Sequence, residues 1–383
     1  MSFNTHDIGR DAFMLNGGLG FEGYDWWWHS FTGVNDRTGK EKSFFVEFFT
    51  CNPVLGGDEP VLGQTEENKR LRRKPSYMMV KAGCWGEGKC QLHRFFPWNK
   101  VRITNSVPFM MSIADCVVSE TILRGSVEVT PEQSEDPGYM CDCGTMEWSL
   151  RMDKQIPFNV GYGAGKMFRS MEAFEMYWHA EGMKTLYTGY VMLNGERYTV
   201  TPETSYGYAD KNWGKNFTSP WIWLSSWDLM SLRTGKRLEN SVFDIGGGCP
   251  KVYFMPLKRK LLGAFMYEGT PYEFNFSKPW TGAKTVFRTK ETEREVFWYV
   301  VLENNEAVMT VRVRCPKTDM LLANYEAPDG SKRHNRLWNG GTGLGLIRLY
   351  SKSAGGKRTL IDEIQAVHIG CEYGEFGEAD SDK

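Results

Sequence analysis

The segment Tyr206-Gly-Tyr-Ala-Asp-Lys-Asn-Trp-Gly-Lys-Asn-Phe-Thr-Ser-Pro-Trp-Ile-Trp-Leu-Ser-Ser-Trp227 holds four tryptophans, two tyrosines and a phenylalanine around the charged pair Asp210-Lys211. Its second half predicts a β-strand beginning after Pro220, because Trp221 and Trp223 fall on one face and the apolar residues beside them on the other. Its first half, from Asp210 to Asn216, is rich in Asn, Asp and Gly and predicts a turn. The segment therefore sets an acid between aromatic side chains.

An acid in such surroundings can serve chemistry on apolar molecules. A carboxyl group among indole rings is desolvated, which raises its pKa and lets it hold a proton near neutral pH. Aromatic faces attract positive charge, so a carbocation formed by protonating an alkene would be stabilised between them. The same residues also suit an ordinary strand and core, with Asp210-Lys211 as a solvated turn pair.

The composition of the whole chain favours an all-β protein. Aromatic residues make up 14% of the 383 residues, and 41 glycines suggest many strands joined by tight turns. With 46 basic and 47 acidic residues, the formal net charge is −1. The chain therefore has no overall electrostatic field that favours nucleic acid or an anionic membrane as a partner. Its composition does not exclude transient contact with a membrane surface.

The length exceeds what one core usually organises, so two domains are expected. Segments with strand character lie on both sides of residue 205 and indicate two antiparallel β-barrels or sandwiches. The expected division is a flexible leader over 1–16, a barrel over 17–204, a second barrel over 205–372 and a frayed acidic tail over 373–383, with the fraying expected after Gly370.

Four local patterns give sharper expectations. Thr145–Asp153 alternates apolar and polar residues, which predicts a strand with one buried face. Asn194-Gly195 is the pair that type I′ hairpin turns prefer. Residues 168–177 are the best candidate for a helix. Residues 53–76 predict a long exposed loop, with a solvated basic run at 69–74.

Several other functional classes lack support in the sequence. The N-terminus has no signal-peptide pattern and no segment approaches the ~20 apolar residues of a membrane span, so a cytoplasmic protein is expected. Nine scattered cysteines favour reduced thiols. Neither Cys84, Cys90 and His93 nor Cys141 and Cys143 has a zinc spacing, so no metal site is predicted.

Common nucleotide and hydrolase motifs are also incomplete. Gly18, Gly20 and Gly23 spell GxGxxG, but bulky aromatic residues follow where a helix should begin. Gly161–Lys166 is one residue short of a phosphate-binding loop, and the chain holds no GxSxG. No cofactor is therefore predicted.

A set of motifs along the chain resembles the tocopherol cyclase family, which is grouped with carotenoid hydratases and some fungal Diels–Alderases among two-domain lipocalin-like proteins. The motifs are Phe21-Glu-Gly-Tyr24, Tyr177-Trp-His179, Thr188-Gly189, Asn194-Gly195, Tyr208-Ala-Asp-Lys-Asn-Trp-Gly214, Trp221-Ile-Trp223 and Gly343-Leu-Gly345. The Ala-Asp-Lys-Asn-Trp-Gly piece corresponds to the family's Ala-Glu-Lys-Asn-Trp-Gly and is the most specific. The match spans nearly the whole chain and is weak outside these motifs.

The resemblance implies two lipocalin-like barrels with a hydrophobic pocket near their junction and an acid-assisted ring closure of a prenylated substrate. Asp210 would be the acid, with Glu22 and His179 as further candidates for proton handling. The expected substrate-binding residues are aromatic: Tyr206, Tyr208, Trp178, Trp213, Trp221 and Trp223. A lone His is nevertheless more often structural than catalytic.

Two departures from the family point to a different substrate. Asp210 reaches about one methylene less far than glutamate. The chain also lacks a plastid transit peptide, which favours a bacterial relative. We therefore expect a cyclase or hydratase that acts on another prenylated or polyene molecule. The alternatives are a non-catalytic carrier of a hydrophobic small molecule, or a pericyclic enzyme whose rate does not depend on Asp210. The oligomeric state is not predictable from the sequence.

Overall fold

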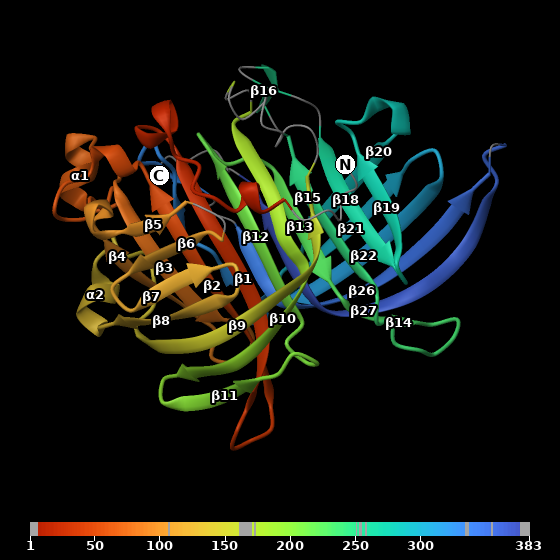
Figure 1. The fold of residues 1–383 in the computed structure, drawn as a ribbon, viewed down its shortest axis with the longest axis horizontal. Coiled ribbons are helices and arrows are strands. Elements are labelled where there is room, and N and C mark those ends of the chain that lie inside the picture. Colours follow the sequence, from red (N-terminus) through yellow and green to blue (C-terminus); the bar gives the residue numbers. More distant parts are fainter. Residues whose placement is uncertain are drawn as a thin grey trace.

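The computed structural model describes residues 7–105, 108–160, 171, 174–249, 251–252, 255–256, 259–333, 337–353 and 355–375. Over these residues the chain forms two large antiparallel sheets, which lie side by side in Figure 1. The expected fold class, an all-β chain with two barrel-like sheets, is confirmed. Among the described residues, no helix is long and apolar enough to cross a membrane.

The first sheet has the strand order β4-β3-β2-β1-β11-β10-β9-β8-β7-β6-β5, with β12 paired to both β1 and β10. It curls so that β4 contacts β8. Its strands are β1 (Tyr24–Asn35), β2 (Glu41–Cys51), β3 (Tyr77–Cys84), β4 (Cys90–Phe96), β5 (Arg102–Thr104), β6 (Met110–Ile113), β7 (Cys116–Ser119), β8 (Ile122–Val129), β9 (Gly144–Phe158), β10 (Met176–Leu193), β11 (Glu196–Val200) and β12 (Gly207–Gly214).

The second sheet has the order β19-β18-β15-β13-β27-β26-β22-β21-β20, with β14 paired to β27 and β23 to β26. It curls likewise, and β18 contacts β20. Its strands are β13 (Trp221–Ser226), β14 (Asp228–Ser231), β15 (Val242–Gly248), β18 (Lys260–Tyr267), β19 (Thr270–Asn275), β20 (Lys284–Glu291), β21 (Glu295–Glu303), β22 (Ala307–Pro316), β23 (Leu321–Leu322), β26 (Trp338–Lys352) and β27 (Arg358–Gly374).

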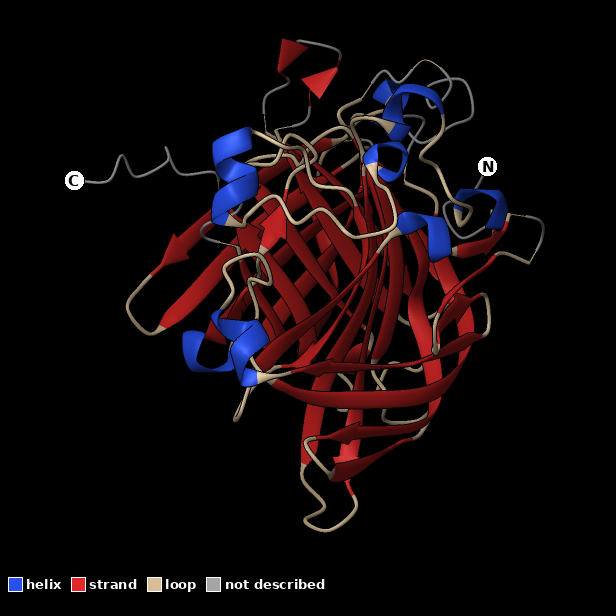
Figure 2. Ribbon diagram, turned by 90° about the vertical axis from the view of Figure 1, so that its left-hand side faces the viewer, coloured by secondary structure: helices blue, strands red, loops and turns tan. Residues whose placement is uncertain are grey.

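Small elements complete the described part of the chain. Two short ribbons pair β16 (Lys251–Val252) with β17 (Met255–Pro256) and β24 (Tyr325–Glu326) with β25 (Lys332–Arg333). The α-helices are α1 (Glu66–Leu71) and α2 (Pro131–Glu135). The 3₁₀ turns are η1 (Ile8–Arg10), η2 (Gly17–Gly20), η3 (Pro53–Leu55), η4 (Trp98–Lys100), η5 (Pro279–Thr281) and η6 (Lys317–Asp319). Figure 2 shows the helices at the periphery of the sheets.

Three hydrophobic clusters account for the packing of the two sheets. One fills the first sheet and includes Trp148 and Phe44; a second fills the second sheet and includes Ile222 and Trp298. A third joins residues of both sheets, among them Trp28, Trp178 and Trp223. Because burial of apolar surface is the main stabilising term, this third cluster holds the sheets together, and the candidate site lies beside it.

Three local predictions are confirmed. Strand β13 begins at Trp221, directly after Pro220. Within β9, burial alternates along Thr145–Asp153 and buries Trp148. Asn194 and Gly195 join β10 to β11 with φ of 48° and 83°, the positive values that a type I′ turn requires.

Other predictions are wrong. The turn expected from Asp210 to Asn216 is instead strand β12 as far as Gly214, because pairing with β1 on one side and β10 on the other outweighs the local preference of Asn, Asp and Gly. The expected loop over 53–76 contains helix α1, which Thr65 caps. The chain does not fray at Gly370, since β27 runs to Gly374.

Half of the expected helix over 168–177 lies outside the described residues, and its last two residues belong to β10. Residues 7–16, expected to be a flexible leader, pack against the first sheet, where Arg10, Asp11 and Leu15 are buried. The chain changes sheet between Gly214 and Trp221 rather than near residue 205.

Candidate active site

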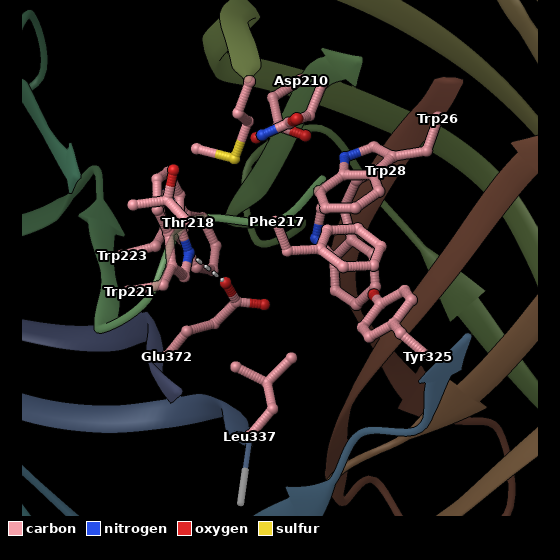
Figure 3. Close-up of a pocket in the computed structure, with 12 residues that line it drawn as sticks. Trp26, Trp28, Asp210, Phe217, Thr218, Trp221, Trp223, Tyr325, Leu337 and Glu372 are labelled. Atoms are coloured by element: carbon pink, nitrogen blue, oxygen red, sulfur yellow. Dashed lines mark hydrogen bonds between the residues drawn. The ribbon is translucent and has the colours of Figure 1, made fainter. Parts of the chain in front are cut away.

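A hollow lies at the junction of the two sheets (Figure 3). The first sheet contributes Trp26 and Trp28 from β1, and the second contributes Trp221 and Trp223 from β13, which face them across the hollow. Two carboxyl groups complete it: Asp210 from β12 and Glu372 from β27. The other lining residues are Met176, Asn212, Phe217, Thr218, Tyr325 and Leu337.

Strand alternation explains why this wall is aromatic. Trp26 and Trp28 are two apart on β1, and Asp210 lies opposite Trp28 in the register of β1 with β12. Trp221 and Trp223 are likewise two apart on β13, while the residue between them, Ile222, points into the core of the second sheet. Each sheet thus presents a pair of indole rings to the other.

The carboxyl group of Asp210 is fixed through one of its oxygens. Its Oδ2 accepts hydrogen bonds from the indole N–H of Trp178 at 2.9 Å and from the hydroxyl of Tyr208 at 3.1 Å. Its buried Oδ1 accepts no hydrogen bond from any of the described residues. Burial raises the pKa of Asp210 well above its ordinary value, and the two hydrogen bonds oppose this only in part.

The position of the proton follows from these contacts. Because Oδ2 already accepts two hydrogen bonds, the proton of neutral Asp210 belongs on Oδ1. Asp210, which lines the hollow, therefore holds an O–H group that is hydrogen-bonded to none of the described residues. This is the arrangement that a general acid needs.

Glu372 has a different environment on the opposite wall. Its Oε2 accepts a hydrogen bond from the indole N–H of Trp221 at 2.9 Å, and its Oε1 accepts one from the amide of Asn339. Burial raises the pKa of Glu372, while both hydrogen bonds and the charge of Lys81 lower it. Because a donor reaches each oxygen, this carboxyl is better suited than Asp210 to the charged form.

A second apolar hollow adjoins the first. It shares Met176, Thr218 and Trp221 with the lining of the first. Trp178, which holds Asp210, also lines it, as do the consecutive glycines Gly246–Gly248 of β15. The site thus extends along the junction beyond the acid.

The structure brings together five of the residues expected in the site. Asp210, Trp221 and Trp223 line the hollow, and Trp178 and Tyr208 hold the carboxyl of Asp210 from behind. It also separates Asp210 from its sequence neighbour Lys211, which points to the other face of β12 and bonds Asp25. Asp210 is therefore not part of a salt bridge with Lys211.

The other expected residues lie elsewhere. Trp213 is on the opposite face of β12 and stacks on Tyr177 at 5.4 Å between ring centroids. The ring of Tyr206 stacks on that of His368, with 4.0 Å between the ring centroids, and Tyr206 does not line the hollow. Glu22 is exposed and pairs with Lys74 at 2.8 Å.

His179 is also remote from the hollow. On β10 it faces the interior of the first sheet, with Nε2 3.1 Å from a carboxylate oxygen of Asp11. Burial lowers the pKa of His179 to about 3, so the ring is neutral at neutral pH. The side chain of its neighbour Trp178 points toward the site instead, because successive residues of a strand point in opposite directions.

Sequence reasoning missed Glu372, Trp26, Trp28 and Tyr325, as well as Asp244, whose carboxyl is hydrogen-bonded to Tyr208 and Trp223. A signal for the two acids exists: Asp244 and Glu372 each interrupt a run of apolar strand residues. An acid inside such a run is seldom buried without a specific reason.

No protein-family model matches the sequence, and no curated protein sequence matches it. Among solved structures, the chain is similar to kievitone hydratase from Nectria haematococca, with a TM-score of 0.46 and 10% identity over 98% of this chain and 97% of that one. It is also similar to CghA, with a TM-score of 0.45 and 11% identity over 93% and 90%. With TM-scores below 0.5, these similarities assign no function, and the resemblance to tocopherol cyclases rests on the motifs alone.

Proposed function

We propose that the protein is a cofactor-independent enzyme that protonates a carbon–carbon double bond of a hydrophobic, prenylated or polyene substrate and so starts a ring closure or a hydration. The observation that carries the proposal is the buried carboxyl of Asp210, with Oδ1 unpartnered among the described residues at an aromatic hollow. A carrier would need the apolar walls but no acid of this kind.

The proposed reaction conserves atoms and charge. The Oδ1–H bond of Asp210 breaks as a C–H bond forms, and the resulting tertiary cation lies between the faces of the tryptophans. An oxygen of the same substrate, or of water, forms a C–O bond with the cation and gives its proton to Glu372. After product leaves, Glu372 releases that proton and Asp210 regains one from water.

The proposal is tested by following the solvent proton into the product. Purified protein is incubated in heavy water with a panel of prenylated quinols and polyenes, and products are identified by mass spectrometry. We expect a product isomeric with the substrate, or one water heavier, that carries one deuterium on carbon. Recovery of every panel compound unchanged but bound would contradict catalysis and favour a carrier.

The rate of this reaction should have a bell-shaped dependence on pH. Since burial raises the pKa of Asp210, its carboxyl stays protonated up to that pKa, and the rate falls as pH rises through it. On the acid side the rate falls as Glu372 becomes protonated, and a Glu372→Gln variant should lose that limb. Initial rates across pH check both limbs, and a rate that climbs steadily with pH would mean that Asp210 acts as a base instead.

A further inference from the structure

A second buried acid, Asp244 of β15, lies behind the site on the other sheet. Its Oδ2 is 3.2 Å from the hydroxyl oxygen of Tyr208, which is also 3.1 Å from Oδ2 of Asp210. Its Oδ1 accepts a hydrogen bond from the indole N–H of Trp223 at 3.0 Å. One tyrosine hydroxyl therefore bridges two carboxyl groups across the junction of the sheets.

The hydrogens available decide how this bridge is built. Tyr208 has one hydroxyl proton and can donate it to only one of the two carboxyls. If both carboxyl groups were ionised, one of them would receive no proton from Tyr208. Its oxygen would then face the hydroxyl oxygen with no hydrogen between them, which is unfavourable in a buried site. Both contacts are satisfied if Tyr208 donates to Asp210 and Asp244 is protonated and donates to Tyr208.

The same conclusion follows from the charge of the site. Asp210 and Asp244 are both buried, and their hydrogen-bond partners Trp178, Trp223 and Tyr208 are neutral. Burial is the largest cause that raises the pKa of Asp244, and a negative charge on Asp210 would raise it further. Two acids in contact through one group do not both ionise readily.

We propose that Asp210, Tyr208 and Asp244 form one proton-sharing unit, in which Asp244 takes over the negative charge that Asp210 would otherwise bear after protonating the substrate. This inference rests on the proposed function of Asp210. As the Oδ1 proton of Asp210 moves to carbon, Tyr208 passes its proton to Oδ2 of Asp210 and receives the proton of Asp244. The charge then rests on Asp244 beside the indole N–H of Trp223, and the transfers reverse when Asp210 regains a proton.

Asp244 is a positioning residue in this scheme, because it acts only through Tyr208. Asn at position 244 can accept from Trp223 through its oxygen and donate to Tyr208 through its amide, so the Asp244→Asn variant keeps the resting hydrogen bonds and removes the mobile proton. Tyr208→Phe keeps the ring and removes the bridge. Asp362→Asn is a matched control: Asp362 is also buried and accepts hydrogen bonds from Ser231 and Tyr267, away from the hollow.

The first experiment needs no substrate. Infrared difference spectra of each variant against the wild type report the carbonyl band of protonated carboxyl groups at neutral pH. We expect Asp244→Asn and Asp210→Asn each to lose one such band, and Tyr208→Phe to shift both. An Asp244→Asn spectrum without that loss would mean an ionised Asp244 and would overturn the inference.

The second experiment measures turnover with a prenylated hydroquinone. Asp244→Asn and Tyr208→Phe should each lower kcat about tenfold or more with KM unchanged, below the factor of ~10²–10⁴ expected for the acid itself. The double variant should be no slower than the slower single one, because both changes break the same chain. Asp362→Asn should match the wild type.

The outcomes separate the two proposals. If Asp210→Asn is inactive while Asp244→Asn and Tyr208→Phe keep wild-type kcat, the sharing unit is wrong and the acid assignment stands. If Asp210→Asn is as active as the wild type, the proposed function fails, and the infrared spectra still decide whether Asp244 holds a proton. Additive losses with a raised KM would indicate a purely structural role and overturn the inference.

Discussion

Replacing Asp210 with asparagine should lower product formation by a factor of about 10²–10⁴ and leave substrate binding unchanged. The amide oxygen of asparagine can accept from Trp178 and Tyr208 as Oδ2 does, and the NH₂ group takes the place of the protonated Oδ1. The variant therefore keeps the shape and hydrogen bonds of neutral Asp210 and loses only the transferable proton.

Binding and turnover are measured separately for this variant. Quenching of tryptophan fluorescence reports binding, because four tryptophans line the hollow. The rate of deuterated product in heavy water reports the chemical step. Unchanged binding with lost product would assign Asp210 to the chemical step, whereas an unchanged rate would favour the pericyclic alternative, in which the pocket only shapes its substrate.

The aromatic half of the site could be predicted because it depends on a local pattern. Trp221 and Trp223 lie on one face of a strand by simple alternation, and Pro220 marks where that strand begins. The same rule separates Trp178 from His179, but it could be applied there only once the segment was known to be a strand. Because a helix was expected over residues 168–177, directly before Trp178, the sequence did not indicate which of the two residues would face the hollow.

The acidic half could not be predicted because it depends on pairing between distant segments. Asp210 looked like a turn residue, and it lies in a strand only because β1 and β10 pair with both edges of β12. Asp244 and Glu372 come from separate strands of the other sheet, on either side of β13. Nothing local in the sequence indicates that these three acids meet at one junction.

The opposite faces of β12 show how one short segment can serve two purposes. Tyr208 and Asp210 face the junction, where a neutral, proton-holding acid is useful. Lys211 faces the interior of the first sheet, where it bonds Asp25 and lies 3.6 Å from the ring centroid of Trp27. The backbone of β12 thus keeps a buried cation close in sequence to the acid while directing its charge away from the hollow.

Replacing Lys211 with methionine should destabilise the fold by about 3–5 kcal/mol, because it leaves the carboxylate of Asp25 buried without its cation. Both side chains are fully buried, so water cannot take the place of the missing partner. Removing both charges together, as in the double variant Asp25→Asn with Lys211→Met, should recover much of this loss. Urea denaturation at neutral pH measures each free energy of unfolding.

The pH dependence of the Lys211→Met deficit gives a second check on its cause. Burial raises the pKa of Asp25 to about 6 even with Lys211 present, from an ordinary value of 3.8. Loss of the cation raises it further, so the folded state binds a proton that the unfolded state lacks, and stability falls as pH rises from 3.8 through the folded pKa. The loss of stability in Lys211→Met should therefore be smallest in acid and largest at neutral and alkaline pH.

The exposed pair of Glu22 and Lys74 is the matched control: Glu22→Gln should change stability by less than about 1 kcal/mol. A deficit for Lys211→Met that is equally small, or that does not vary with pH, would mean that Asp25 is already neutral in the native protein.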